Sequence, residues 1–136
     1  MQKNKVIVER YAPSVLRVGM ALVILWFSSQ QMMSPNNWGA YVPDSVVALT
    51  HLSAITLVWG NAIFELVFGL MLLFGWQTRI AAVLLALHLL DIMYVVGYGE
   101  IGVRDFGLAI ATFVIAMNGP DVLAVEYKGG QPSPMV

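Results

Sequence analysis

The chain has 136 residues, of which 59% are hydrophobic and 11% are charged, and its formal net charge is -1. A soluble domain is typically about 45–50% apolar and about 25% charged, so this composition excludes a water-soluble globular protein and predicts a single membrane domain. The lack of cysteine excludes disulfide frameworks, thiol relays and thiolate-bound metal centres, and the near-neutral charge predicts no nucleic-acid partner.

The first predicted membrane helix covers residues 15–33. A basic stretch with Lys3, Lys5, Arg10 and Arg17 leads into an uncharged run over residues 18–33. Such a start also occurs in signal peptides, but no small-residue cleavage site follows the run, so we expect the helix to be retained. Residues 34–45 are rich in proline, asparagine and glycine, which predicts a polar, turn-rich loop.

Two further helices are predicted over residues 46–75 and 79–97. Because only about four residues form the turn between them, they must be antiparallel neighbours. A fourth helix is predicted over residues 102–118, but its uninterrupted apolar part, 106–117, rises only about 18 Å against a hydrocarbon core of about 30 Å. We therefore expect either an earlier helix start that buries Arg104 and Asp105 or a water-filled recess that reaches them. The tail, residues 119–136, is predicted to be interfacial or disordered.

Lysine and arginine residues predict the orientation. Four lie in the amino-terminal segment, Arg79 follows the second helix and Lys128 lies in the tail, whereas Arg104 is alone on the other side. The positive-inside rule then places both termini in the cytoplasm. Arg17 and Arg79 are the predicted topology anchors, and we expect Arg17 to extend towards the lipid phosphates. The predicted fold is an all-α, antiparallel four-helix bundle, a single domain over residues 1–136 that crosses the cell (inner) membrane several times.

Ionisable groups at membrane depth are the candidate functional residues, because charges there are costly. Glu65 lies about 16 Å from the inner edge of its helix, and His88 and Asp91 lie about 14 and 18 Å from the edge of theirs. Glu65 shares a helix face with Asn61, and His88 shares one with Asp91. The residues predicted to line a polar pocket are Asn61, Glu65, His88, Asp91, Arg104 and Asp105, with Gln30 and Gln31 at its rim.

This predicted pocket allows more than one function. Hydrogen-bonding groups and protonatable carboxylates suit the head group of a quinone, and they equally suit a proton path. Alternatively, the same groups satisfy one another and hold the helices in register, since polar contacts between membrane helices contribute about 0.6–2 kcal/mol. No catalytic residue and no metal site is predicted, because His51 and His88 lie at different depths and the methionines are expected to fill gaps.

Three segments carry a family resemblance: LRVGMALVILW, FELVFGLMLLFGWQTRIAAVLLAL and RDFGLAIATFVIAMNGPDVLAVE. The middle one is the most specific, with Glu65, Gly69, Gly75 and Arg79 at the expected positions. In these segments the chain resembles the DoxX family of small four-helix membrane proteins, whose relatives include the large subunit of a thiosulfate:quinone oxidoreductase.

The resemblance implies a membrane subunit associated with redox chemistry. A quinone is then the one expected cofactor, with neither a metal nor a covalent group. The expected partners are the lipid bilayer and either other membrane subunits or a second copy of the chain. Any catalysis would need a quinone, a partner subunit or both. The alternatives are a non-catalytic accessory subunit of a larger membrane complex and a carrier of protons or small solutes.

Overall fold

The computed structural model describes residues 2–129, which form six α-helices and no strand. The helices are α1 (Gln2–Met33), α2 (Pro35–Gly39), α3 (Asp44–Thr50), α4 (Ala54–Phe74), α5 (Thr78–Val96) and α6 (Glu100–Asn118). The all-α prediction is therefore confirmed over these residues.

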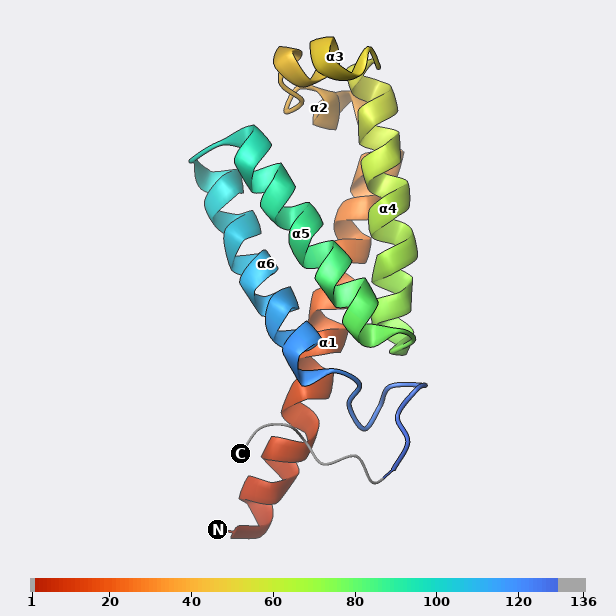
Figure 1. Cartoon of the computed structure of the whole chain (residues 1–136), viewed down its shortest axis with the longest axis vertical. Coiled ribbons are helices and arrows are strands. Elements are labelled where there is room, and N and C mark those ends of the chain that lie inside the picture. The colour runs from red at the N-terminus through yellow and green to blue at the C-terminus, as the bar shows by residue number, and fades with distance from the viewer. Residues whose placement is uncertain (1, 130–136) are drawn as a thin grey trace.

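The four long helices lie side by side, and the two short helices cover one end of them (Figure 1). α1 packs mainly on α4 and α5 mainly on α6, while contacts between α4 and α5 and between α1 and α6 join the two pairs. One end of the molecule contains the start of α1, the turn between α4 and α5 and the end of α6. We call it the terminal end. α2, α3 and the turn between α5 and α6 lie at the opposite end, which we call the cap end. Consecutive long helices are therefore antiparallel.

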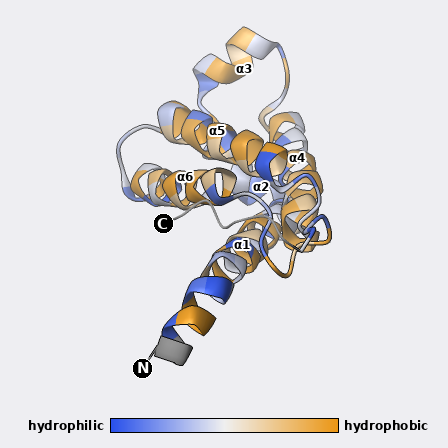
Figure 2. Cartoon of the chain, turned by 60° about the horizontal axis from the view of Figure 1, so that its bottom comes forward, coloured by the Kyte–Doolittle hydropathy of each residue, from blue (hydrophilic) through white to orange (hydrophobic). Residues whose placement is uncertain are grey.

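The surface of the long helices suits a lipid environment. Three segments are long and apolar enough to cross a membrane, residues 5–33, 54–74 and 78–96. α6, which carries Glu100, Arg104 and Asp105, is not among them. Apolar residues dominate the outward faces of the long helices (Figure 2), and the exposed ones include Leu22, Trp26, Ile63, Val83, Leu87 and Phe113. A soluble protein rarely exposes so continuous an apolar surface, so the fold is that of a membrane protein.

Small side chains form much of the contact between the helices. Ala21, Ala62, Ala81 and Ala82 are fully buried, together with the larger Leu85. Small residues let helix backbones approach closely, which is the usual source of packing energy where no water is displaced between the helices.

The predicted second helix is wrong at its start. Residues 44–50 form α3, and His51 then adopts a left-handed conformation with φ of 57° that ends this helix. α4 begins only at Ala54, where the side chain of Ser53 accepts a hydrogen bond from the backbone N–H of Thr56. A left-handed residue ends one helix, and a serine N-cap shortly after it begins another. The apolar run over residues 46–74 gave no indication of this break.

The first helix and the following loop also differ from the prediction. α1 begins at Gln2 instead of near residue 15, and it includes Pro13. The predicted loop over residues 34–45 contains α2 and the first residues of α3. α1 ends before Pro35, and Pro35 then occupies the first turn of α2, where a missing N–H costs nothing.

The later helices agree with the prediction within two residues at each end. α6 begins at Glu100, so the early helix start, one of the two expected alternatives, is observed. Asp105 is 2% exposed and Arg104 is partly exposed. The lack of a side chain at Gly102 allows α6 to start this early, because a Cβ atom there would lie 2.1 Å from the carbonyl oxygen of Gly97.

Residues 119–129 of the tail pack against the terminal end. The backbone N–H of Val125 donates to the carbonyl of Phe74 at 3.0 Å, and that of Glu126 donates to the carbonyl of Gly75 at 3.2 Å. The tail thus lies against the turn between α4 and α5, and the disordered alternative is wrong for residues 119–129. The interfacial location stays a prediction, and residues 130–136 lie outside the described part of the chain.

Candidate functional site

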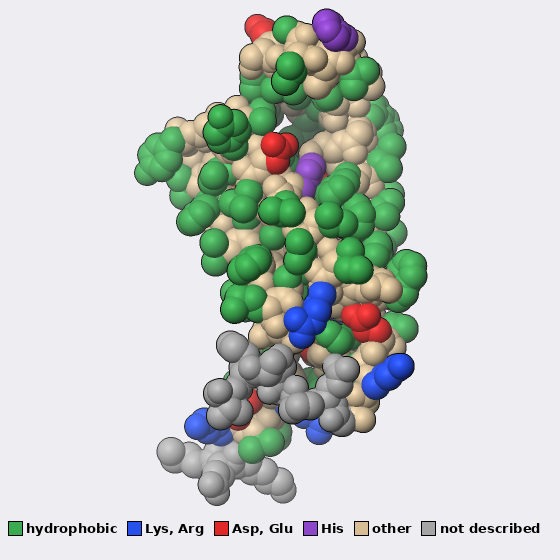
Figure 3. All heavy atoms as spheres, viewed as in Figure 1, with side chains coloured by type: hydrophobic (Ala, Val, Ile, Leu, Met, Phe, Trp, Pro, Cys, Tyr) green, Lys and Arg blue, Asp and Glu red, His purple; other side chains and the backbone are tan. Residues whose placement is uncertain are grey.

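A cavity of about 550 Å³ lies between the long helices near the cap end. All six predicted pocket residues line it: Asn61, Glu65, His88, Asp91, Arg104 and Asp105. The other walls are largely apolar and come from α1, α4, α5 and α6 and from the segment around α2 and α3. Figure 3 shows the surface hollowed below the cap, with an acidic and a histidine side chain beside the hollow. The structure therefore brings together residues that the sequence could only assign to separate helices.

A chain of amide and carboxylate groups joins α1 to α4 inside the cavity wall. The side-chain N–H of Asn61 donates to Gln31 Oε1 at 2.7 Å, and Gln31 Nε2 donates to Glu65 Oε2 at 2.7 Å. Gln31 and Glu65 are each 4% exposed. Asn61 and Glu65 lie on one face of α4, one turn apart, so a single glutamine can bond to both. Gln31 was expected at the rim of the pocket and instead lies within its polar wall.

His88 faces the remaining oxygen of Glu65. The distance from His88 Nε2 to Glu65 Oε1 is 3.7 Å, which is too long for a hydrogen bond. This nitrogen is buried and has no hydrogen-bond partner among the described residues, and its ring packs 4.5 Å from the ring of Phe64. A buried polar atom without a partner costs about 1–3 kcal/mol, so a ligand atom that bonded to this nitrogen would be stabilised.

Arg104 and Asp105 of α6 pair with each other. Arg104 Nε donates to Asp105 Oδ1 at 2.8 Å, and the guanidinium carbon of Arg104 lies 4.4 Å from the centre of the Phe27 ring. The pair thus places one positive and one negative charge together at the cavity wall, where they offset each other. Asp91 is exposed at the cavity and makes no hydrogen bond or ion pair with any described residue.

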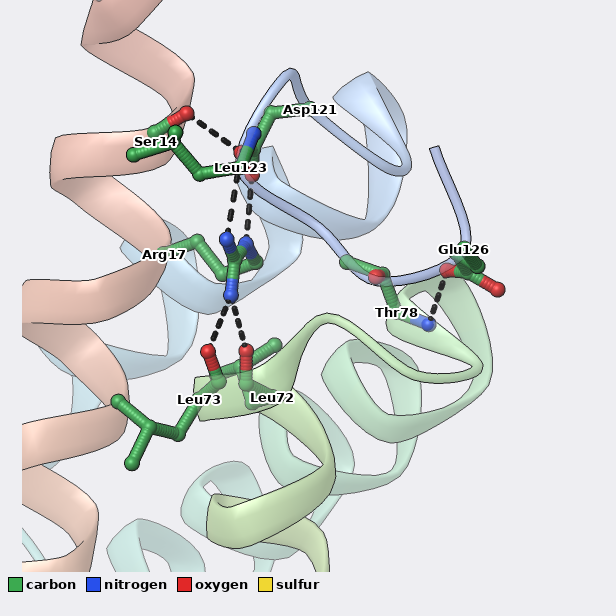
Figure 4. A network of polar contacts seen from close by, with 8 residues as sticks. All are labelled: Ser14, Arg17, Leu72, Leu73, Thr78, Asp121, Leu123 and Glu126. Carbon is green, nitrogen blue, oxygen red and sulfur yellow. Dashed lines mark hydrogen bonds and ion pairs between the residues drawn. The ribbon is translucent and has the colours of Figure 1, made fainter. Parts of the chain in front are cut away.

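A second polar cluster lies at the terminal end (Figure 4). Arg17 Nε donates to Asp121 Oδ2 at 2.6 Å and Nη2 donates to Oδ1 at 3.2 Å, while Nη1 donates to the carbonyls of Leu72 and Leu73 at 2.7 and 2.6 Å. Arg17 is 1% exposed. Its expected extension towards the lipid phosphates is therefore wrong, because Asp121 and the last carbonyls of α4 provide hydrogen-bond partners inside the protein. Its role in setting the topology stays a prediction.

Asp121 was missed by sequence reasoning. It follows Gly119-Pro120 in a polar tail, where an acidic residue is ordinarily solvated, and nothing in the sequence indicates its burial. Burial alone would raise the pKa of Asp121, but hydrogen bonds from Arg17, Ser14 and the backbone N–H of Leu123, together with the charge of Arg17, hold it below its ordinary value of 3.8.

Two further residues fasten the terminal end. The carboxylate of Glu126 accepts from the backbone N–H groups of Gln77 and Thr78 at 3.1 and 2.7 Å, which satisfies the free donors at the start of α5. Arg79 directs its guanidinium towards the carbonyls of Ala116 and Met117 at the end of α6, at 3.4 Å each. Its predicted function as a topology anchor is not tested by these contacts.

The part of the chain that the structure describes contains no group of three or more histidine or acidic residues that could hold a metal ion. The polar residues that line the cavity include the hydrogen-bonding side chains of His88, Glu65 and Asp91.

The fold and the site together define an all-helical membrane protein with a ligand-sized cavity near one end of its long helices. The family model of DoxX matches residues 12–98. The chain therefore belongs to the DoxX family. The match covers Glu65, His88 and Asp91 and ends before Arg104 and Asp105. No significant match to a curated protein or to a solved structure was found.

Proposed function

We propose that this protein is a quinone- or lipid-facing subunit of a membrane-bound redox complex and that its cavity holds the head group of a lipophilic ring compound. In this proposal the four long helices form a transmembrane bundle in the cell (inner) membrane, with both termini cytoplasmic. The observation that carries the proposal is the cavity itself. Its volume of about 550 Å³ falls within the range of about 300–1,000 Å³ that is usual for small-molecule sites.

The composition of the cavity wall supports a ring compound with an apolar tail. Apolar walls with a small number of fixed polar groups are typical of such sites. Reduction of a quinone to a quinol takes up two electrons and two protons. Glu65, His88 and Asp91 can carry protons, whereas the electrons would come from a redox-active partner subunit. The chain is accordingly proposed as a subunit and not as a complete enzyme.

Filling the cavity tests the proposal. Gly60 lines the cavity, and a Cβ atom at this position would meet nothing within 4 Å, so the side chain of Gly60→Leu can start into open space. Gly19→Leu is the matched control, because this position on α1 is equally open and does not line the cavity. In lipid nanodiscs, we expect the wild type and Gly19→Leu to bind decylbenzoquinone equally and Gly60→Leu to bind it at least about tenfold more weakly. Equal binding by all three proteins, or no binding to the wild type, would contradict the proposal.

A second candidate function is that of a non-catalytic accessory subunit, and the bonds from Asn61 through Gln31 to Glu65 favour it. These groups satisfy one another across α1 and α4, as polar contacts that hold helices together do. Both functions predict partners, which isolation from native membranes in gentle detergent followed by mass spectrometry would identify. Retention of a quinone in the isolated complex, and its loss in Gly60→Leu, would separate the first function from the second.

A further inference from the structure

We propose that the cavity recognises a hydroxyl group on its ring ligand, with the hydroxyl oxygen held between His88 Nε2 and Glu65 Oε1. The inference rests on the proposed function and deepens it. It states that the preferred ligand is a phenol or a quinol, the hydroxylated form, in preference to the corresponding ether or carbonyl compound.

The distance between the two atoms suits one bridging oxygen. They are 3.7 Å apart, so they do not bond directly, yet an oxygen about 2.8 Å from each can bond to both. Both residues line the cavity, and the side chain of His88 retains 17% of its exposed surface. Since Nε2 itself is covered, binding of the oxygen requires a small turn of the imidazole ring towards the cavity. The ligand oxygen then satisfies the buried nitrogen that has no other partner.

The neighbouring amides determine which oxygen of Glu65 is free. Asn61 donates to Gln31 Oε1, so the other end of the Gln31 amide is the donor, and it bonds to Glu65 Oε2. Glu65 Oε1 is left facing His88. Gln31 is therefore a positioning residue, because it acts on the ligand through the orientation of the Glu65 carboxylate.

Hydrogen-bond chemistry then selects a hydroxyl. A carboxylate only accepts, and a neutral imidazole with a proton on Nε2 donates from that atom, so the bridging oxygen must accept one hydrogen bond and donate another. A hydroxyl does both, whereas a carbonyl or ether oxygen only accepts. If Glu65 Oε1 carries a proton and His88 Nε2 carries none, the hydroxyl accepts from Glu65 and donates to His88, so it again satisfies both atoms. A carbonyl oxygen satisfies both only when the pair carries two protons.

The experiment compares two probes that differ in one hydrogen-bond donor, 4-nonylphenol and its methyl ether. Binding is measured to the full chain in nanodiscs, with empty nanodiscs as the blank for partition into lipid. A hydrogen bond to a charged group predicts that the wild type binds the phenol about tenfold to a hundredfold more tightly than the ether. We expect this ratio to approach one in His88→Phe, which removes the nitrogen and keeps a ring against Phe64. It should decrease in Glu65→Gln, since an amide accepts a weaker hydrogen bond than a carboxylate.

Asp44→Asn is the matched acid-to-amide control, because Asp44 lies in α3 and does not line the cavity, and its ratio should equal that of the wild type. Equal binding of phenol and ether by the wild type overturns the inference, and this result needs no variant to fold. A ratio that His88→Phe leaves unchanged also overturns it. In either case the proposed function stands if decylbenzoquinone still binds and Gly60→Leu still prevents it. If neither the quinone nor the phenol binds, both fail.

Discussion

The cluster around Arg17 predicts a large loss of stability when its acidic partner is removed. Asp121→Ala leaves the buried guanidinium of Arg17 without the two hydrogen bonds that it donates to this carboxylate. It also removes the acceptor for the hydroxyl of Ser14 and for the backbone N–H of Leu123. The substitution thus isolates one positive charge at a site that is 1% exposed.

The expected magnitude follows from these contacts. Removing one member of a buried ion pair costs about 3–5 kcal/mol, mostly because the other charge is left uncompensated. Arg17 keeps its hydrogen bonds to the carbonyls of Leu72 and Leu73, which reduces the loss, so we expect about 3 kcal/mol for Asp121→Ala. In the double variant with Arg17→Met neither charge of this pair remains. The two substitutions together should therefore cost at least about 2 kcal/mol less than the sum of the single ones.

The measurement is a double-mutant cycle of unfolding in detergent. Helix content is followed by circular dichroism as the fraction of denaturing detergent is raised, for the wild type, Asp121→Ala, Arg17→Met and the double variant. Asp44→Asn serves as the control for loss of an exposed acid on α3. Free energies that add within about 0.5 kcal/mol would refute the reasoning, because they would show that the two side chains do not interact.

Two further predictions concern the same end and the opposite end of the molecule. Because the pKa of Asp121 lies below its ordinary value of 3.8, the stability it contributes is complete above that pH and is lost only as the pH falls through the lowered pKa. Unfolding free energies should thus show an acid-dependent loss in the wild type that Asp121→Asn lacks, and identical pH profiles would contradict this. At the cap end, Gly102→Ala should lower stability by about 1–3 kcal/mol, since its Cβ would meet the Gly97 carbonyl. Gly107→Ala, where a Cβ meets nothing within 4 Å, is the control, and an equal effect of both would refute the close contact.

The ends of the helices could be predicted where a glycine follows the apolar run and could not where local geometry decides. The bounds of α5 and α6 agree with the prediction within two residues, and each helix ends at a glycine. The break before α4 could not be read from hydropathy. It depends on the left-handed conformation of His51 and the cap formed by Ser53, and both lie within an apolar stretch.

The sequence predicts which residues form the candidate site more fully than it predicts the contacts between them. Charges inside apolar runs are conspicuous, so Glu65, His88 and Asp91 could be selected from the sequence. Gln31 carries no charge and lies at the end of an apolar run, where nothing marks it as the bonding partner of Glu65. Asp121 lies in a polar tail, so neither its burial nor its pairing with Arg17 had a signal.

The sequence by itself determined that this protein is helical, that it belongs in a membrane and which ionisable groups lie within its apolar helices. Those conclusions follow from composition and from local periodicity, because the bilayer requires long apolar helices with satisfied backbones. Only the tertiary structure decided which polar groups meet. Arg17 and Leu72 are 55 residues apart in the chain, and Ser14 and Asp121 are 107 apart. Their meeting depends on how each helix is rotated about its axis and on the path of the tail, and both are fixed by packing between segments that are distant in sequence.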